Sequence, residues 1–177
     1  GGAVALNTPF DKEIAELSAK LDDTRLYYGT AEEKDRMKEK VAATEKIHAG
    51  LSVAARARRA EFNTSAGGRK NLLGENELVA AVVEGDVSLE DLDEEALPEP
   101  LKTMAPAAQE AYVAELSEKR EDLQRQIRAL SEDRSSYLAK KVDEAGGMKS
   151  SLDQKLYDAV KDQASDAGLE YEDGPAY

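Results

Sequence analysis

The sequence predicts an all-α protein that contains a long antiparallel helical hairpin or coiled coil, shorter helices packed against it and at most two short strands. Charged residues make up 34% of the 177 residues and aromatic residues only 5%, a composition typical of long helices and coiled coils. Residues 117–141, SEKREDLQRQIRALSEDRSSYLAKK, contain neither Gly nor Pro. Around this stretch, large apolar residues recur every seven positions, which favours a helix with one narrow apolar row.

The longest helix is expected from about residue 106 to about residue 145, between a Pro and a pair of Gly residues. Forty helical residues span about 60 Å. So thin an apolar row does not stabilise an isolated helix, and another helix must cover it. The residues predicted to form this seam are Tyr112, Leu116, Leu123, Ile127, Leu130 and Tyr137.

A second long helix is expected over about 31–63, and it is the candidate partner for the seam. It begins with a capping box formed by Thr30 and Glu33, and apolar residues then recur every three or four positions. Gly50 interrupts it at a cost of about 1 kcal/mol relative to Ala, so a bend is expected there. Either this helix folds back on the longest helix as an antiparallel rod, or a second copy of the chain covers the seam in a homodimer.

Shorter elements are expected around these two helices. An amphipathic helix begins at the Thr8 cap, and a strand follows at 25–28. The acidic segment before Pro106 is interrupted by Pro, so it is expected to form short helical turns whose leucines pack on the core. Further helices are predicted over 75–85 and 151–168. The strand needs a partner, which is either the segment 169–172 or a sheet upstream of this chain.

The charge distribution limits the expected partners. A net charge of −13 disfavours nucleic acid, because phosphate binding requires a basic surface. Residues 31–70 nevertheless carry a net charge of +4, so we expect them to dock on acidic surface of the same protein. No apolar run approaches the ~20 residues of a membrane-spanning helix, and membrane insertion is not expected. The chain contains no Cys, which excludes thiol chemistry.

Three motifs are candidates for catalytic or metal sites, and each lacks an essential part. His48 is the only histidine, and Glu45 with His48 gives one Glu-x-x-His pair where a di-metal helical bundle needs two. The acidic run at 86–99 has Asp91 and Leu97 where a calcium loop needs Gly and Glu. Residues 66–71, AGGRKN, lack the spacing of a phosphate-binding loop. We therefore expect no catalytic residues, no cofactor and no metal in this chain.

Two stretches resemble a known family. Residues 7–29, NTPFDKEIAELSAKLDDTRLYYG, resemble the closing helix and strand of the von Willebrand factor type A (VWA) domain in a group of bacterial proteins. Residues 78–141 and 151–172 are similar to the helical region that follows that domain. The resemblance implies that residues 1–29 are the tail end of an upstream VWA-like domain and that 30–177 form the helical region.

The resemblance also implies where ligand recognition occurs. The family's metal-dependent adhesion site needs a D-x-S-x-S loop, and the nearest string here, DVSLE at 86–90, lacks the second Ser. The metal site is therefore expected in the upstream domain. A periplasmic or exported location is also suggested by this resemblance. Gly1 and Gly2 resemble a cloning scar, so the start of the chain is expected to be an artificial boundary.

These observations predict a non-catalytic helical interaction or scaffold region that spaces, presents or oligomerises an adjoining ligand-binding domain. Its expected partners are proteins, namely the VWA-like domain and a second copy of the chain. The sequence is also compatible with two alternatives. One is a metal-binding or enzymatic helical bundle. The other is a holdase-like coiled-coil adaptor, which would need an exposed apolar tip near 138–152, where Val142 and Met148 are the candidates.

Overall fold

A computed structural model describes residues 6–65 and 67–144 of the chain. The helix predicted at 151–168 and the segment 169–172 lie outside these residues. Of these residues, those up to Arg134 belong to one compact unit, and residues 135–144 belong to a second. The described part is mostly helical, which confirms the all-α prediction. In chain order the elements are α1 (Asp11–Asp22), α2 (Ala31–Ala49), α3 (Val53–Thr64), α4 (Arg69–Leu73), α5 (Leu78–Glu84), the 3₁₀ turn η1 (Leu89–Asp91), α6 (Glu99–Lys102) and α7 (Pro106–Glu144).

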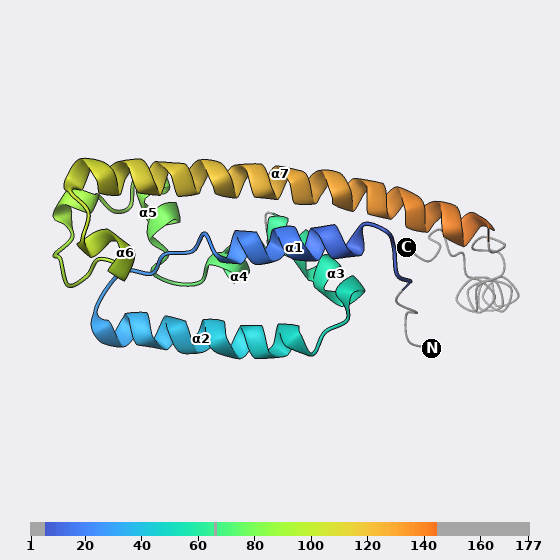
Figure 1. The fold of residues 1–177 in the computed structure, drawn as a ribbon, viewed down its shortest axis with the longest axis horizontal. Helices are drawn as coiled ribbons and strands as arrows, with labels where there is room; N and C mark the ends of the chain where they lie inside the picture. The colour runs from blue at the N-terminus through green and yellow to red at the C-terminus, as the bar shows by residue number, and fades with distance from the viewer. Residues whose placement is uncertain (1–5, 66, 145–177) are drawn as a thin grey trace, which may run out of the picture. The chain divides into compact units, whose positions relative to one another are not determined.

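Helix α7 is the predicted longest helix, and it runs antiparallel to α1 (Figure 1). Asp11 at the start of α1 contacts Arg134, whereas Thr24, just after α1, contacts Arg120. Apolar side chains fill the space between these two contacts and form one core with α3, α4 and α5. The buried members contributed by α1 and α7 are Ile14, Leu17, Leu21, Leu123 and Ile127.

The prediction of one helix over 31–63 is corrected by the structure. Helix α2 ends at Ala49 with Gly50 as its C-cap, and the Ser52 hydroxyl accepts a hydrogen bond from the Ala55 N–H to start α3. Gly50 and Ser52 supply a stop signal and a start signal that outweigh the continuous apolar periodicity. As a result, α3 joins the core through Ala57 and Ala60, while α2 lies on the far side of α1 from α7 (Figure 1). The antiparallel partner of α7 is therefore α1 rather than α2.

A second apolar cluster lies at the N-terminal end of α7. Its leucines come from the Pro-interrupted segment between α5 and α7, which forms short helical turns packed on the core, as predicted. The buried residues are Leu26, Leu78, Val79, Leu89, Leu97, Leu101, Val113 and Leu116. This cluster and the first one together cover the seam of α7 from Tyr112 to Leu130 with several elements of the same chain.

The strand predicted at 25–28 is an extended segment that forms a single antiparallel bridge, Tyr27 with Glu77. The Tyr28 N–H donates to the Asn76 carbonyl at 3.1 Å, and the Leu78 N–H donates to the Leu26 carbonyl at 2.7 Å. Its partner in the structure is thus the entry to α5. The predicted domain boundary after residue 29 stays a prediction, although α1 shares its core with α3 and α7.

Two buried arginines of α7 fix its register. The Arg120 side chain is 6% exposed and binds Glu77 through both terminal nitrogens at 2.9 Å. The same guanidinium donates to the Thr24 hydroxyl and carbonyl. The Glu77 carboxylate also accepts the N–H groups of Leu26 and Ala80. One ion pair therefore joins α7, the extended segment and the start of α5.

The second arginine, Arg134, binds Asp11 at 2.7 Å, with both side chains buried. Asp11 also accepts the N–H and the hydroxyl of Thr8. Burial alone would raise the pKa of Asp11, but the hydrogen bonds from Arg134 and Thr8 outweigh burial and lower the pKa below its ordinary value. The carboxylate is thus ionised through the neutral and mildly acidic range, and the contact holds the start of α1 against α7.

Truncating the seam tests the packing of α7. Ile127 is fully buried, whereas Ile47 on α2 is 66% exposed. We expect Ile127→Ala to lower the free energy of unfolding by about 2–5 kcal/mol, because it leaves a cavity in the core. The matched Ile47→Ala should change it by less than about 0.5 kcal/mol. Urea denaturation followed by circular dichroism measures both values, and equal losses would contradict this packing.

Breaking the Arg120–Glu77 pair should cost more than breaking an exposed pair on the same helix. Arg120→Met leaves the Glu77 carboxylate buried without its cation, so we expect a loss of about 3–5 kcal/mol. Adding Glu77→Gln should recover part of this loss, since no buried charge then remains. Arg125→Met, which removes a largely exposed contact with Asp122, should cost less than about 1 kcal/mol. A double-mutant cycle in urea that shows no coupling between residues 120 and 77 would refute the assignment.

Candidate interaction groove

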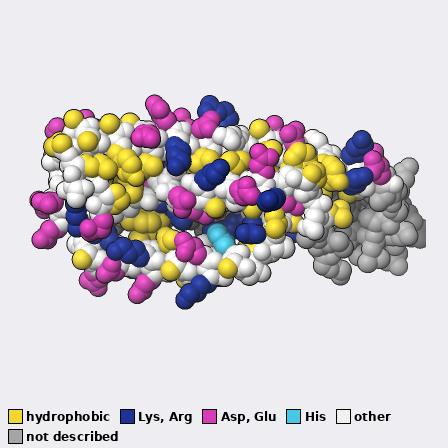
Figure 2. Space-filling model, in the orientation of Figure 1, with side chains coloured by type: hydrophobic (Ala, Val, Ile, Leu, Met, Phe, Trp, Pro, Cys, Tyr) yellow, Lys and Arg dark blue, Asp and Glu magenta, His cyan; other side chains and the backbone are white. Residues whose placement is uncertain are grey.

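An open groove of about 940 Å³ lies between α2 and the α4–α5 region. Its volume is at the upper end of the range for pockets that hold small molecules. Tyr27, Leu72, Leu73 and Ala80 line it, and the last three also belong to the α1–α7 core. Figure 2 shows hydrophobic side chains at the surface between α2 and the elements above it, flanked by charged groups. The base of the groove is thus a continuation of the core.

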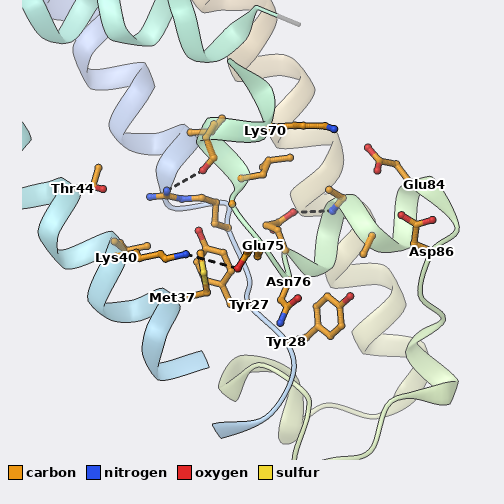
Figure 3. Close-up of a pocket in the computed structure, with 18 of the residues that line it drawn as sticks. Tyr27, Tyr28, Met37, Lys40, Thr44, Lys70, Glu75, Asn76, Glu84 and Asp86 are labelled. Atoms are coloured by element: carbon orange, nitrogen blue, oxygen red, sulfur yellow. Dashed lines mark hydrogen bonds and ion pairs between the residues drawn. The ribbon is translucent and has the colours of Figure 1, made fainter. Parts of the chain in front are cut away.

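Helix α2 forms the opposite wall of this groove. Met37, Val41 and Thr44 line it at helical spacing, and Figure 3 shows Met37 and Lys40 projecting from α2 toward Tyr27 and Glu75. Val41 and Thr44 are only half-buried. The apolar row of α2 is therefore partly uncovered along the groove.

The N-terminal part of α2 is firmly attached. The Thr30–Glu33 capping box is present, as predicted. The buried Lys34 ammonium donates to the carbonyls of Glu95 and Leu97 at 2.5 and 3.0 Å. Met37 is 4% exposed, and a Cβ added at Gly74 would lie 2.8 Å from its terminal methyl group. Gly74 has a φ of +74°, which a residue with a side chain adopts only under strain.

The C-terminal part of α2 is weakly attached. Lys34 and Met37 are the buried residues of this helix, and every residue from 38 to 49 is exposed or half-buried. Arg36 and Lys40 approach Glu75 at 3.4 and 3.8 Å, but all three side chains are more than half exposed. Such contacts are worth at most about 1 kcal/mol. Helix α2 is consequently anchored at one end only.

Charges of both signs border the groove. Lys70 on α4 is exposed, and so are Glu84 and Asp86 at the end of α5. Figure 3 shows Glu84 and Asp86 on the side of the groove away from α2. Burial raises the pKa of the Tyr27 phenol above its ordinary value, so this hydroxyl stays neutral at physiological pH. The groove thus combines an apolar base with a charged border.

His48 lies at the weakly attached end of α2, near ionisable groups of α1 and α3. Burial lowers the pKa of His48 below its ordinary value of 6.5, and the nearby Arg59 guanidinium lowers it further. Burial raises the pKa of Asp22, although Arg25, Arg59 and His48 partly offset this effect. Burial also lowers the pKa of Arg59. His48 Nε2 is buried and has no hydrogen-bond partner among the described residues.

The predicted seam residues lie mainly inside the fold. Leu116, Leu123 and Ile127 are buried, while Tyr112 and Leu130 are half-buried against the two apolar clusters. Tyr137 follows Arg134 in the second unit, where the Lys141 ammonium lies 5.8 Å from its ring centre. The sequence does not predict this groove. The row through Met37, Val41 and Thr44 was visible, but periodicity alone does not show how much of a row another element covers.

No arrangement of described residues resembles a metal site: within 6–65 and 67–144, no group of three His, Cys, Asp or Glu side chains is placed to hold a metal ion. None of the helices in that part of the chain is long and apolar enough to cross a membrane. No protein-family model, curated protein or solved structure matches this chain. The resemblance to VWA-associated proteins stays a prediction.

The anchor of α2 can be tested by removing the Lys34 ammonium. Lys34→Met keeps the length of the apolar stem but loses both hydrogen bonds to the Glu95 and Leu97 carbonyls. We expect amide hydrogen exchange across α2 to accelerate, with a loss of about 1.5–3 kcal/mol in local stability. Lys38→Met, at a largely exposed position of the same helix, is the matched control and should leave exchange unchanged. Unchanged α2 protection in Lys34→Met would show that the helix is held elsewhere.

Proposed function

We propose that this chain is a non-catalytic helical interaction region that binds an amphipathic helix of a partner protein in the groove between α2 and α4–α5. The observation that carries this proposal is the partly uncovered apolar row of α2, which faces Tyr27 and Ala80 across the groove. An apolar surface of this kind, bordered by charged residues, is typical of protein-binding sites. The firmly packed α1–α7 pair provides the rigid base beneath it.

The secondary structure around the groove favours a helix as the occupant. Both sides are formed mainly by helices, whose backbone groups are largely bonded within each helix. The bridge of Tyr27 with Glu77 already uses the N–H of Tyr28 and the carbonyl of Asn76. An incoming segment that satisfies its own backbone hydrogen bonds therefore fits better than an extended strand.

The border of the groove defines the chemistry of this helix. An apolar stripe with a spacing of three or four residues would contact the half-buried side chains of Tyr27, Val41 and Thr44. An acidic residue would complement Lys70, and a basic residue would complement Asp86. The partner we propose is thus an amphipathic helix with a carboxylate near one end of its apolar stripe and a cation near the other.

The resemblance described above supports a wider role for this region. If residues 30–177 follow a VWA-type domain, their role would be to space or present that domain while the groove recruits a partner. The antiparallel packing of α1 on α7 suits such a spacer, because the Arg134–Asp11 ion pair and the hydrogen bonds of Arg120 to Thr24 keep the helices in register.

The proposal is tested with a display library of helical peptides that carry apolar residues every three or four positions and variable charges. Selected peptides should shift the amide NMR signals of residues around the groove. We expect Val41→Asp to weaken their binding by at least about tenfold, or 1.4 kcal/mol, because the bound peptide would bury an unpaired carboxylate.

The matched control is Ile47→Asp, which adds the same charge to the same helix at an exposed position outside the groove. It should leave the affinity unchanged within about twofold, since no buried charge is created. Peptides that perturb only the outer face of α7, or that bind Val41→Asp as well as the natural sequence, would refute the groove as the binding site.

A further inference from the structure

The weakly attached end of α2 meets a cluster of ionisable groups drawn from several elements. His48 is on α2, Asp22 ends α1, Arg25 belongs to the extended segment, and Arg56 and Arg59 belong to α3. All four of these neighbours act electrostatically on His48. The chain contains no other histidine. The group that ordinarily titrates closest to neutral pH thus lies where α2 is least firmly held.

The balance of charge around His48 is positive. Three arginines and one carboxylate act on it, and the carboxylate is already engaged, since Asp22 lies 3.2 Å from the Arg25 guanidinium. Burial adds to this effect, because Nε2 has little access to water. A proton added to His48 would therefore meet net repulsion in a partly desolvated place.

The backbone next to His48 allows α2 to move. Gly50 ends the helix, and a Cβ added there would make only an ordinary contact, 3.5 Å from the Ile47 carbonyl oxygen. Leu51 and Ser52 complete a short connection to α3. At the other end, Lys34 and Met37 keep the helix attached. If α2 pivots at the end held by Lys34 and Met37 while the connection at residues 50–52 changes conformation, residues 41–49 move away from α1 and α3 and the groove widens.

We propose that protonation of His48 releases the C-terminal half of α2 from α1 and α3, so that α2 is a lid that opens the groove when the surroundings become mildly acidic. This inference rests on the proposed function for its purpose, since the groove is the binding site only in that proposal. The movement itself requires no ligand.

The direction of the pH dependence follows from proton linkage. The lowered pKa of His48 means that the closed form binds this proton less readily than the open form, in which the ring is exposed to water. Opening is therefore favoured as the pH falls below 6.5, by at most about tenfold for each pH unit. The raised pKa of Asp22 has the opposite effect, because the closed form takes up this proton at a pH above the ordinary value of 3.8. Because the ordinary pKa of His48 is higher than that of Asp22, the effect of His48 should appear first as the pH falls, and opening should begin on the mildly acidic side of neutrality.

The experiment measures the distance between α2 and α5 without a ligand. Because the chain has no native Cys, spin labels can be placed uniquely at Lys46→Cys and Val83→Cys, both exposed positions. Double electron–electron resonance at pH 7.5, 6.5, 5.5 and 5.0 should show a longer distance whose population rises by up to about fivefold between pH 6.5 and 5.5 while it remains small. A label pair at Ala19→Cys and Glu132→Cys, on α1 and α7, should keep one distance throughout.

Two variants identify the responsible group. His48→Gln, which cannot titrate, should abolish the pH response. Arg59→Gln should shift the opening to lower pH, because a protonated His48 is then repelled less strongly, and the neighbouring exposed Arg58→Gln serves as its matched control. A distance between α2 and α5 that does not change with pH, or a response that persists in His48→Gln, would contradict the proposed lid. A simultaneous change in the α1–α7 distance would also contradict it, because it would indicate general unfolding. Since no peptide is present, these results are separate from those that test groove binding.

Discussion

The ion pair between Arg120 and Glu77 is the constraint on which the rest of this structure depends. Removing two charges from water is costly, so the pair is stable only when every polar atom of both groups finds a partner. Thr24 and the N–H groups of Leu26 and Ala80 supply those partners. They come from segments far apart in the sequence, so the pair fixes the position of α7, the path of the extended segment and the start of α5 together. The Arg134–Asp11 pair holds the other end of α1 in the same register.

The packing of α1 against α7 contrasts with the packing of α2. The α1–α7 pair buries large apolar side chains between two ion pairs, whereas α2 buries one lysine and one methionine near its start. The difference follows from composition, because α2 carries mostly charged residues and Ala, with few side chains able to bury apolar area. Low local stability beside a rigid base is the usual property of a segment that moves when a protein binds its partner. One unit thus contains a firmly packed part, formed by α1 and α7, and a loosely packed part, formed by α2.

The sequence allowed the all-α class and the bounds of α7 to be predicted closely, because a Pro, a Gly pair and a sustained apolar period agree there. It did not reveal the partner of α7. Arg120 and Arg134 continue the spacing of the seam, but charged residues at such positions are ordinarily solvated, and Glu77 and Asp11 lie too far along the chain for sequence spacing to pair them. The break at Gly50–Ser52 was underestimated because the apolar period continues through it. The groove could not be predicted, since it depends on how far short helices leave α2 uncovered.

The opposed directions of α1 and α7 have a mechanical consequence. Thr8 and Arg134 lie at the same end of the helix pair. Tension applied to the chain at these two points would therefore peel the helices apart, one contact after another, instead of shearing all contacts at once. The Arg134–Asp11 contact would carry the load first, and the hydrogen bonds of Arg120 to Thr24 would break only after the apolar contacts between them had separated. Under tension, the end of the helix pair at Thr24 and Arg120 would therefore be the last part to separate.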